Sequence, residues 1–314
     1  MKGPVAVLGA GSMGHGIAEI LAREFKTVWL YDPDLEQLKG VKKRISDSLL
    51  RLRKYGLITD QTAKLTLERI KTTSEIKQAV ELASFIIEAV PENLQLKQDL
   101  LGSLDSISHD DAIFATNTSS YTILEISKGV PQKRHSNIVG SHFFLPAQIV
   151  PLVEVSRGIF TTDDVFLNTF SLWLRCGKKP IKVNRDVPGY VGNRLQRAIV
   201  RESLALLAEG TATAEDIDLA VQMGFGVRYQ VRGPLAQRDF AGLDLAATVQ
   251  IDETDQERLK RGRQYLLELV ARGDLGLKTG RGLLNWEGKD INDLQKMDDD
   301  RLAEAVAMLG IKAR

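Results

Sequence analysis

The sequence predicts an α/β fold in which a mostly parallel sheet carries helices on both faces, followed by an all-α domain. Up to residue 183, short apolar runs alternate with segments of helical periodicity, which is typical of βαβ units. The segment Asp186–Tyr190, which contains a Pro-Gly pair, then interrupts the pattern, and beyond it the apolar spacing is helical throughout. We therefore expect one domain at residues 1–185 and a second at residues 186–314.

The first four elements are a strand, a glycine-rich turn, a helix and a second strand that ends in an acid. Pro4–Leu8 is apolar, Gly9-Ala10-Gly11-Ser12-Met13-Gly14 follows directly, and Val28–Tyr31 is the next apolar run. Asp32 closes that run, 18 residues after the last glycine. A G-x-G-x-x-G turn with both flanking elements and a late acid is the fingerprint of a dinucleotide-binding site.

The glycine turn also predicts which cofactor binds. Gly9 allows the tight turn, Gly11 lets a pyrophosphate approach the backbone, and Gly14 lets helix and strand pack closely. Free N–H groups at the start of the helix, around Met13, hold the diphosphate. Asp32 accepts hydrogen bonds from the adenosine ribose, and no Arg or Lys follows it closely, which favours NAD over NADP. A glycine-rich turn of some other α/β protein is the less favoured alternative.

Further strands and helices continue the alternation. Apolar runs predict strands at 85–90, 112–117, 138–142, 152–155 and 180–183, and helical periodicity predicts helices at 34–54, 60–69, 93–106, 122–128 and 162–176. The strands around Pro146 and Pro151 lie close together in sequence, so we expect this part to leave the simple βαβ pattern.

The second domain is expected to be built from helices alone. Thr213 precedes Glu215 and Asp216, which is typical of a helix start, and Gly233-Pro234 separates this region from the next segment. Helical domains of this kind often pair across a two-fold axis, so we expect a homodimer.

Composition and charge exclude several classes of function. Lys and Arg total 42 against 41 acids, so no overall field recruits nucleic acid or an anionic membrane. No apolar run approaches the ~20 residues of a membrane span, and the first strand leaves no room for a signal peptide. The single cysteine, Cys176, forms no internal disulfide and no metal site, and we expect it to be a buried residue at a helix end. A cytoplasmic protein without a bound metal is the expectation.

Of the four histidines, His142 is the one placed for proton exchange near neutral pH. It ends the apolar run that begins at Ile138, and in an open parallel sheet ligands bind beyond the carboxyl ends of the strands. Glu154 interrupts a second apolar run nearby. Because an isolated buried carboxylate is costly, a His–Glu pair would compensate the burial of Glu154 and would also form a base. The alternative is a buried pair with a structural role.

Two polar segments are expected at the same edge of the sheet. Asn117-Thr118-Ser119-Ser120 ends one strand, and Pro91-Glu92-Asn93 ends another, with Lys97 one turn into the following helix. These residue types cap helices, and capping is compatible with ligand contact, so both readings stay open. Asn193 and Arg194 begin the second domain, where it is expected to face the cofactor.

At these motifs the chain resembles the 3-hydroxyacyl-CoA dehydrogenase family over nearly its whole length. The resemblance implies a Rossmann-type domain followed by a helical dimerisation domain, with the substrate in the cleft between them. The segments that carry it are Gly9-Ala10-Gly11-Ser12-Met13-Gly14, Pro91-Glu92-Asn93-Leu94, Asn117-Thr118-Ser119-Ser120, His142-Phe143-Phe144, Pro151-Leu152-Val153-Glu154-Val155, Pro188-Gly189-Tyr190-Val191-Gly192-Asn193-Arg194 and Lys278-Thr279-Gly280-Arg281-Gly282.

The resemblance also implies roles for single residues. His142 is implied to be the general base and Glu154 its orienting partner, while Ser119 and Asn193 contact the substrate. Ser48 and Lys54 fall near the helix positions that contact CoA in the family. The residues implied to help hold NAD are Glu92, Lys97 and Asn117.

Other positions leave the substrate open. The family usually has Asn where Leu145 stands, and the segment 224–234 is closer to the branch that oxidises free hydroxy acids, such as L-gulonate 3-dehydrogenase and lambda-crystallin. Arg228 and Arg232 in that segment either clamp a free carboxylate or are ordinary surface residues. The basic residues along helix 39–54 are either a solvated face or a landing site for an anionic ligand tail.

The expected reaction is reversible NAD-dependent oxidation of the 3-hydroxyl of a short-chain L-3-hydroxyacyl-CoA, a step of fatty acid metabolism. His142 takes the hydroxyl proton while the hydride leaves C3. Oxidation of a free 3-hydroxy acid is the first alternative. A structural NAD-binding protein is the second, and the intact set of candidate catalytic residues argues against it.

Overall fold

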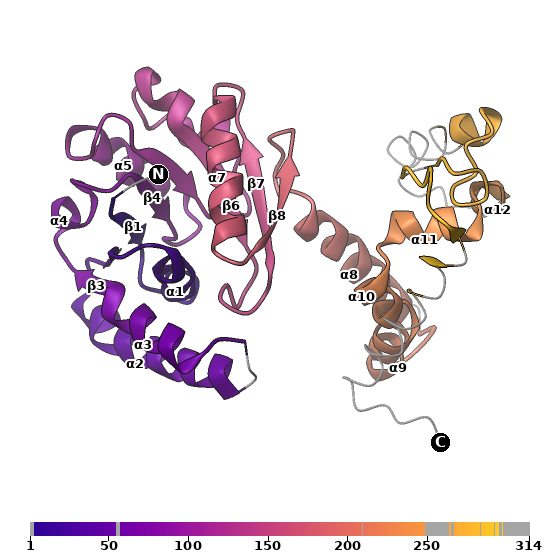
Figure 1. The fold of residues 1–314 in the computed structure, drawn as a ribbon, viewed down its shortest axis with the longest axis horizontal. Helices are drawn as coiled ribbons and strands as arrows, with labels where there is room; N and C mark the ends of the chain where they lie inside the picture. The colour runs from indigo at the N-terminus through magenta and orange to yellow at the C-terminus, as the bar shows by residue number, and fades with distance from the viewer. Residues whose placement is uncertain are drawn as a thin grey trace. The chain divides into compact units, whose positions relative to one another are not determined.

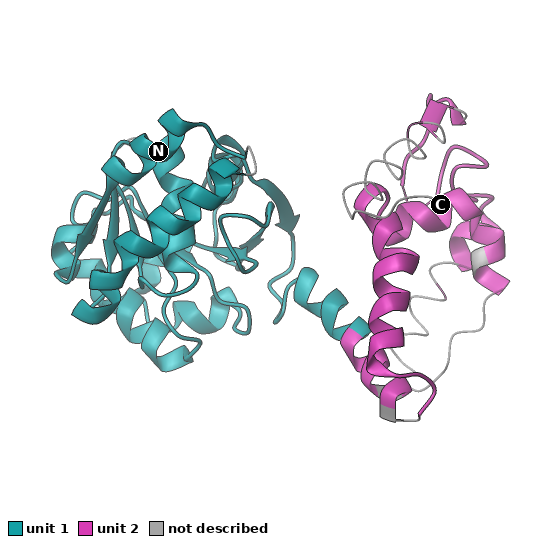
Figure 2. Cartoon of the chain, turned by 90° about the horizontal axis from the view of Figure 1, so that it is seen from below, with its two compact units in different colours: residues 1–199 teal, residues 200–314 magenta. Residues whose placement is uncertain are grey.

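A computed structural model describes residues 3–54, 57–208, 210–248, 264, 267–282, 284–291, 293–294 and 297. The chain divides into two compact units, residues 1–199 and residues 200–314 (Figure 2). Each unit is described by itself below.

The first unit is built on one eight-stranded sheet (Figure 1). Its spatial order is β3-β2-β1-β4-β5-β6-β7-β8, which is a doubly wound arrangement with the first strand near the middle. The strands are β1 (Val5–Leu8), β2 (Val28–Tyr31), β3 (Ile70–Thr73), β4 (Phe85–Glu88), β5 (Ile113–Thr116), β6 (Ile138–Phe143), β7 (Leu152–Arg157) and β8 (Lys179–Val183).

Helices cover both faces of this sheet because its central strands are apolar on both sides. In β1, Val5 and Val7 belong to one buried cluster, while Ala6 and Leu8 belong to the other. The first cluster includes side chains of α1 (Gly14–Glu24), α2 (Leu35–Lys54), α3 (Asp60–Arg69) and α7 (Asp163–Arg175). The second includes side chains of α4 (Ile76–Val80), α5 (Leu94–Ser103) and α6 (Ile123–Ser127). The predicted α/β class and its mostly parallel sheet are confirmed.

Two short elements were not predicted from the sequence, the edge strand β3 and the helix α4. The first residue of β3, Ile70, is its only large apolar side chain, because Lys71, Thr72 and Thr73 complete the strand. It pairs with β2 in parallel register. An edge strand needs few apolar side chains, so the periodicity of the sequence does not reveal it.

The sheet leaves the parallel pattern between β6 and β7, as the sequence predicted. These two strands pair antiparallel, and the register places His142 directly opposite Glu154. β7 then pairs with β8 in parallel. Side chains directly opposite in an antiparallel pair lie on the same face, so the ladder itself brings the two candidate catalytic residues together.

The second unit is helical, as predicted. α8 (Gly192–Ala208) continues from the first unit into the second. It is followed by α9 (Ala214–Leu219), a π-helical segment at Ala220–Gly226, α10 (Val227–Val231), α11 (Pro234–Ala241) and α12 (Leu243–Thr248). The Thr213 hydroxyl accepts from Asp216 N at the start of α9, and Pro234 begins α11, which confirms the two boundaries expected there. No helix in the described part of the chain combines the length and the apolar character that a membrane crossing requires.

Candidate active site

The glycine turn between β1 and α1 has the geometry that its sequence predicts. Gly9 has φ +105°, and a Cβ there would lie 2.7 Å from Ala89 O. A Cβ on Gly14 would lie 1.7 Å from Gly9 O, so helix and turn touch at this point. A Cβ on Gly11 would meet nothing within 4 Å. Gly9 and Gly14 are therefore required by the fold, while Gly11 leaves open space in front of the backbone, where a diphosphate fits.

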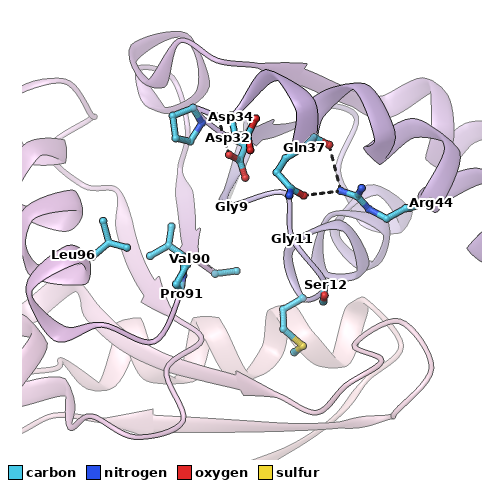
Figure 3. Close-up of a pocket in the computed structure, with 13 residues that line it drawn as sticks. Gly9, Gly11, Ser12, Asp32, Asp34, Gln37, Arg44, Val90, Pro91 and Leu96 are labelled. Carbon is cyan, nitrogen blue, oxygen red and sulfur yellow. Dashed lines mark hydrogen bonds between the residues drawn. The ribbon is translucent and has the colours of Figure 1, made fainter.

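A cavity of about 730 Å³ lies against this turn (Figure 3). Asp32 stands in its wall, where Oδ2 accepts from Ala10 N at 2.8 Å and Oδ1 from Asp34 N at 2.9 Å. Each oxygen keeps a lone pair for a ribose hydroxyl. The cavity therefore fits the adenosine end of a dinucleotide. Its lining residues are Gly9, Gly11, Ser12, Met13, Asp32, Pro33, Asp34, Gln37, Arg44, Ala89, Val90, Pro91 and Leu96.

The cavity also contains a cation that sequence reasoning missed. Arg44 comes from the third turn of α2, yet its Nη2 donates to Ala10 O at 2.7 Å. In the sequence, no Arg or Lys stands directly after Asp32. A helical residue that folds back onto the turn gives no signal at that spacing.

His142 and Glu154 form the hydrogen bond that the sequence predicted. His142 Nδ1 lies 2.6 Å from Glu154 Oε2, with the His142 side chain 6% exposed and that of Glu154 fully buried. Glu154 Oε1 accepts from Val191 N at 2.9 Å and from Gly192 N at 2.8 Å, at the start of α8. Oε1 is thus occupied by two backbone N–H donors, and Oε2 is the oxygen left to face the imidazole. His142 Nδ1 is then the donor to Glu154, and Nε2 is left as the basic atom.

Two aromatic rings hold the His142 imidazole in place. Phe144 packs edge-on at 4.9 Å between centroids, and Tyr190 lies at 5.4 Å. Tyr190 is buried at a left-handed backbone position, φ +43°, and burial raises the pKa of its hydroxyl above the ordinary value. The sequence had given Tyr190 only as part of the linker motif. It is a wall of the site.

A second cluster lies at the ends of β4 and β5. Lys97 Nζ donates to Glu88 Oε1 at 2.6 Å and lies 3.2 Å from Glu92 Oε2. Glu92 Oε1 accepts from Thr118 Oγ1 at 2.6 Å and from the backbone N of Ser119 at 2.9 Å. Although burial opposes it, these hydrogen bonds and Lys97 hold the pKa of Glu92 below its usual range. Lys97 and Glu92 thus organise the loop that carries Ser119.

Glu88 was missed from the sequence, although a signal existed. It interrupts the apolar run 85–90 in the same way that Glu154 interrupts its own strand. It is fully buried and also accepts from Thr116 Oγ1 at 2.7 Å and from Val90 N at 2.8 Å. The argument used for Glu154, that a buried carboxylate needs partners, applies equally here.

Contacts in the first unit tie the other predicted residues to the His142 site. Asn117 Oδ1 accepts from Phe143 N at 2.9 Å, which leaves its NH₂ group as a donor next to the end of β6. Ser119 O accepts from Gly189 N at 3.1 Å, so the loop of Ser119 meets the segment before α8. Asn193 follows Gly192 in the first turn of α8, directly after the two N–H groups that bind Glu154.

The four candidate substrate residues are divided between the two units. Ser48 is buried on the inner stripe of α2, and its hydroxyl donates to Glu19 Oε2 at 2.9 Å, while Lys54 ends the same helix. Arg228 and Arg232 belong to the second unit, where Arg232 stacks 3.7 Å over the ring of Phe240. The hydroxyl of Ser48 is therefore engaged within the first unit.

Comparison with known proteins identifies the family. The family model "3-hydroxyacyl-CoA dehydrogenase, NAD binding domain" matches residues 4–187, and "3-hydroxyacyl-CoA dehydrogenase, C-terminal domain" matches residues 189–286. A probable 3-hydroxybutyryl-CoA dehydrogenase of Bacillus subtilis is 34% identical over 91% of this chain and 98% of its own length.

Two further matches have a different substrate in their names. The 5-formyl-3-hydroxy-2-methylpyridine 4-carboxylate 5-dehydrogenase of Mesorhizobium japonicum is 30% identical over 93% of this chain and 93% of its own length. A solved structure of a 5-formyl-3-hydroxy-2-methylpyridine 4-carboxylic acid 5-dehydrogenase, described as an NAD⁺-dependent dismutase, is 28% identical with a TM-score of 0.73 and covers 99% of this chain and 100% of that one. The glycine turn, the cavity and both family models agree, so this chain belongs to the 3-hydroxyacyl-CoA dehydrogenase family of oxidoreductases, with NAD as its cofactor.

Proposed function

We propose that the chain oxidises the 3-hydroxyl of a short-chain L-3-hydroxyacyl-CoA, such as 3-hydroxybutanoyl-CoA, reversibly to the 3-oxo form. The observation that carries the proposal is the 2.6 Å hydrogen bond from His142 Nδ1 to Glu154 Oε2, since it leaves Nε2 as a base in a site walled by aromatic rings. The B. subtilis relative supports the substrate class.

In the proposed mechanism His142 Nε2 accepts the proton of the substrate hydroxyl. A base acts when it lies within roughly 2.6–3.2 Å of that hydroxyl, directly or through one water. Glu154 stabilises the imidazolium that forms, because its carboxylate is held in place by Val191 N and Gly192 N and cannot turn away. Bound NAD would supply the acceptor for the hydride that leaves C3. Ser119 and Asn193 are proposed to hold the substrate oxygens, so that C3 faces the cofactor.

The residues proposed to hold NAD divide into two groups. Gly9, Gly11 and Met13 line the cavity and are proposed to receive the diphosphate, with Gly14 supporting them as the first residue of α1, and Asp32 is proposed to receive the ribose. Glu92, Lys97 and Asn117 are proposed to act at the nicotinamide end. Lys97 is only 1% exposed, so we expect it to act through Glu92 and the Ser119 loop.

The thioester part of the substrate is the least constrained element of the proposal. Along α2 the exposed side chains include Lys39, Lys42, Lys43, Arg51 and Lys54, a cationic strip that suits the phosphates of CoA. Ser48 faces the core instead, so we assign any CoA contact on this helix to the exposed cations.

A free hydroxy acid is the second candidate substrate. It is favoured by the relative from M. japonicum, which is named for a substrate with a free carboxylate. It is also favoured by Leu145, which lies three residues after His142 and is 63% exposed. In this case Arg228 or Arg232 is the proposed carboxylate partner.

A substrate panel decides between the candidates. NADH absorbance is followed with 3-hydroxybutanoyl-CoA and with free 3-hydroxybutanoate at equal concentrations. We expect kcat/KM to favour the thioester by at least about 100-fold, the scale of about 3 kcal/mol of binding energy. A preference for the free acid would replace the first candidate by the second. Absence of turnover across the whole panel would favour a structural NAD-binding protein.

We infer a homodimer from α8. The side chains of Leu195, Ile199, Val200, Leu204 and Leu207 are apolar and exposed in the single chain, and light scattering measures whether a second copy covers them. A cytoplasmic location and a role in fatty acid metabolism are further parts of the proposal, and growth of a deletion strain on short fatty acids tests the latter.

A further inference from the structure

Two opposite charges bind the backbone of a single residue of the glycine turn, Ala10. Ala10 N donates to Asp32 Oδ2 at 2.8 Å, and Ala10 O accepts from Arg44 Nη2 at 2.7 Å. Both side chains line the same cavity (Figure 3). The carboxylate proposed to bind the ribose and the Arg44 guanidinium are therefore linked through the backbone of one residue.

At these contacts Arg44 forms no ion pair with a carboxylate. The three acceptors of its Nη2 are neutral oxygens, namely Ala10 O at 2.7 Å, Gln37 O at 3.3 Å and Gln37 Oε1 at 3.5 Å. The side chain is half-buried, so solvent screens it less than it screens the exposed lysines of α2.

Gly40 makes room for this arrangement. A Cβ on Gly40 would lie 3.0 Å from Arg44 Nη1, so the guanidinium folds back across the glycine toward the turn. Glycine inside a helix costs about 1 kcal/mol relative to alanine. At Gly40 the missing side chain leaves space for the Arg44 guanidinium, which a Cβ would contact closely.

We propose that Arg44 is a second determinant of dinucleotide selectivity and opposes Asp32. Asp32 accepts from ribose hydroxyls and repels a 2′-phosphate, whereas a guanidinium binds phosphate oxygens through two N–H groups. Arg44 therefore raises the affinity of the pocket for 2′-phosphorylated adenosine above the level that Asp32 alone would allow. The chain uses NAD, but it discriminates against NADP less strongly than its glycine-acid motif suggests.

The competing explanation is that Arg44 only braces the glycine turn. A brace affects every ligand of the turn alike, whereas a selectivity determinant affects only the ligand with a 2′-phosphate. Binding of ADP-ribose and of 2′-phospho-ADP-ribose to the full-length chain separates the two, because neither ligand contains nicotinamide and no turnover is needed.

Isothermal titration calorimetry gives both dissociation constants for the wild type, Arg44→Gln, Arg44→Lys and Asp32→Asn. We expect Arg44→Gln to weaken 2′-phospho-ADP-ribose about tenfold, the scale of one charge-assisted hydrogen bond, while ADP-ribose changes less than about threefold. Arg44→Lys, which keeps the charge, should retain part of the effect. Asp32→Asn should strengthen the 2′-phosphorylated ligand.

Arg69→Gln is the matched control. Arg69 also donates to backbone carbonyls, Ala22 O at 2.9 Å and Arg23 O at 3.2 Å, but it does not line the cavity. For Arg69→Gln we expect the ratio of the dissociation constants of ADP-ribose and 2′-phospho-ADP-ribose to equal that of the wild type. Equal weakening of both ligands by Arg44→Gln, or no change in either, would overturn the proposal. These binding results do not depend on whether the substrate is a thioester or a free acid.

Discussion

Glu88 and Glu154 are two buried carboxylates of one sheet, and they differ in whether a hydrogen-bond partner keeps an atom that can accept a proton. Glu88 accepts from Lys97, Thr116 and Val90 N, and every one of these donors serves the carboxylate. Glu154 accepts from two backbone N–H groups and from His142, whose second ring nitrogen remains available.

A buried carboxylate therefore indicates that the fold supplies hydrogen-bond partners for it, but burial alone does not indicate that the site is reactive. An ammonium has only protons to give, so the Lys97–Glu88 pair organises the loop around it. An imidazole held by one nitrogen can exchange a proton through the other. The proposed base differs from the structural pair because His142 keeps a second nitrogen that can accept a proton, whereas Lys97 has no acceptor atom.

Replacing the base should have the largest effect. We expect His142→Gln to lower kcat about 1,000-fold, within the 10²- to 10⁴-fold range of general-base catalysis, because glutamine accepts no proton. Calorimetric binding of NAD should remain within about threefold of the wild type, a change below 1 kcal/mol. Full turnover by purified His142→Gln would remove this residue from the role of base.

Breaking the structural pair should act on stability instead. Lys97→Met leaves Glu88 buried without its cation, and we expect the free energy of unfolding in urea to fall by about 3 kcal/mol. The double variant Glu88→Gln/Lys97→Met should recover part of that loss, because no charge remains to be buried. If the single variant is as stable as the wild type, Glu88 and Lys97 are not the coupled pair described here.

Removing the charge of Glu154 should affect rate more than fold. In Glu154→Gln the oxygen can still accept from Val191 N and Gly192 N, but the amide NH₂ then meets His142 Nδ1. The imidazole is driven to the wrong tautomer, so we expect kcat to fall about 100-fold, less than when the imidazole itself is lost. Single-turnover kinetics measures this change, and thermal unfolding within a few degrees of the wild type supports an intact fold. A variant with normal kcat would show that the tautomer does not matter.

The smallest expected effect is the pH dependence of stability caused by a third buried carboxylate, Glu19 on α1. It accepts from Ser48 but its Oε1 has no hydrogen-bond partner, and burial raises its pKa to about 8 from 4.5. Between these values the folded chain holds a proton that the unfolded chain has lost, so stability falls as pH rises. The loss is up to about 1.4 kcal/mol per pH unit.

Glu19→Gln should remove this pH dependence. Chemical denaturation at pH 5, 6 and 7 should show the variant gaining stability relative to the wild type as pH rises. Nearby Lys178, whose burial lowers its pKa to about 8, stays charged over this range in both states. The exposed Glu36→Gln should show no trend. A constant difference between Glu19→Gln and the wild type would mean that Glu19 titrates normally.

Most of the sheet could be predicted because its central strands are apolar on both faces and separated by regular helices. The His142–Glu154 pair was also within reach of the sequence, since a lone acid in a buried strand requires a partner. The inward position of Ser48 was readable too, because it lies on the same helical stripe as Val41, Ile45 and Leu52.

Other features depend on three-dimensional reach. Arg44 reaches Ala10 O by folding back across Gly40, which no spacing rule contains. The close approach of Tyr190 to the imidazole depends on a left-handed backbone position at a non-glycine residue. The domain boundary proposed at 185/186, just before the Pro-Gly segment, stays a prediction. The compact units divide at 199/200, within α8, whose first residue, Gly192, donates its N–H to Glu154.

The antiparallel ladder between β6 and β7 has a consequence for how this site can vary. His142 and Glu154 are opposite each other through main-chain pairing, so the connection at 144–151 does not set their spacing. Exposed residues of that connection such as Leu145 can be exchanged, next to where substrate is proposed to bind, while Phe144 keeps its contact with the imidazole and the ladder keeps the two side chains in register. New substrate preferences can therefore arise at this loop without rebuilding the proton-transfer pair.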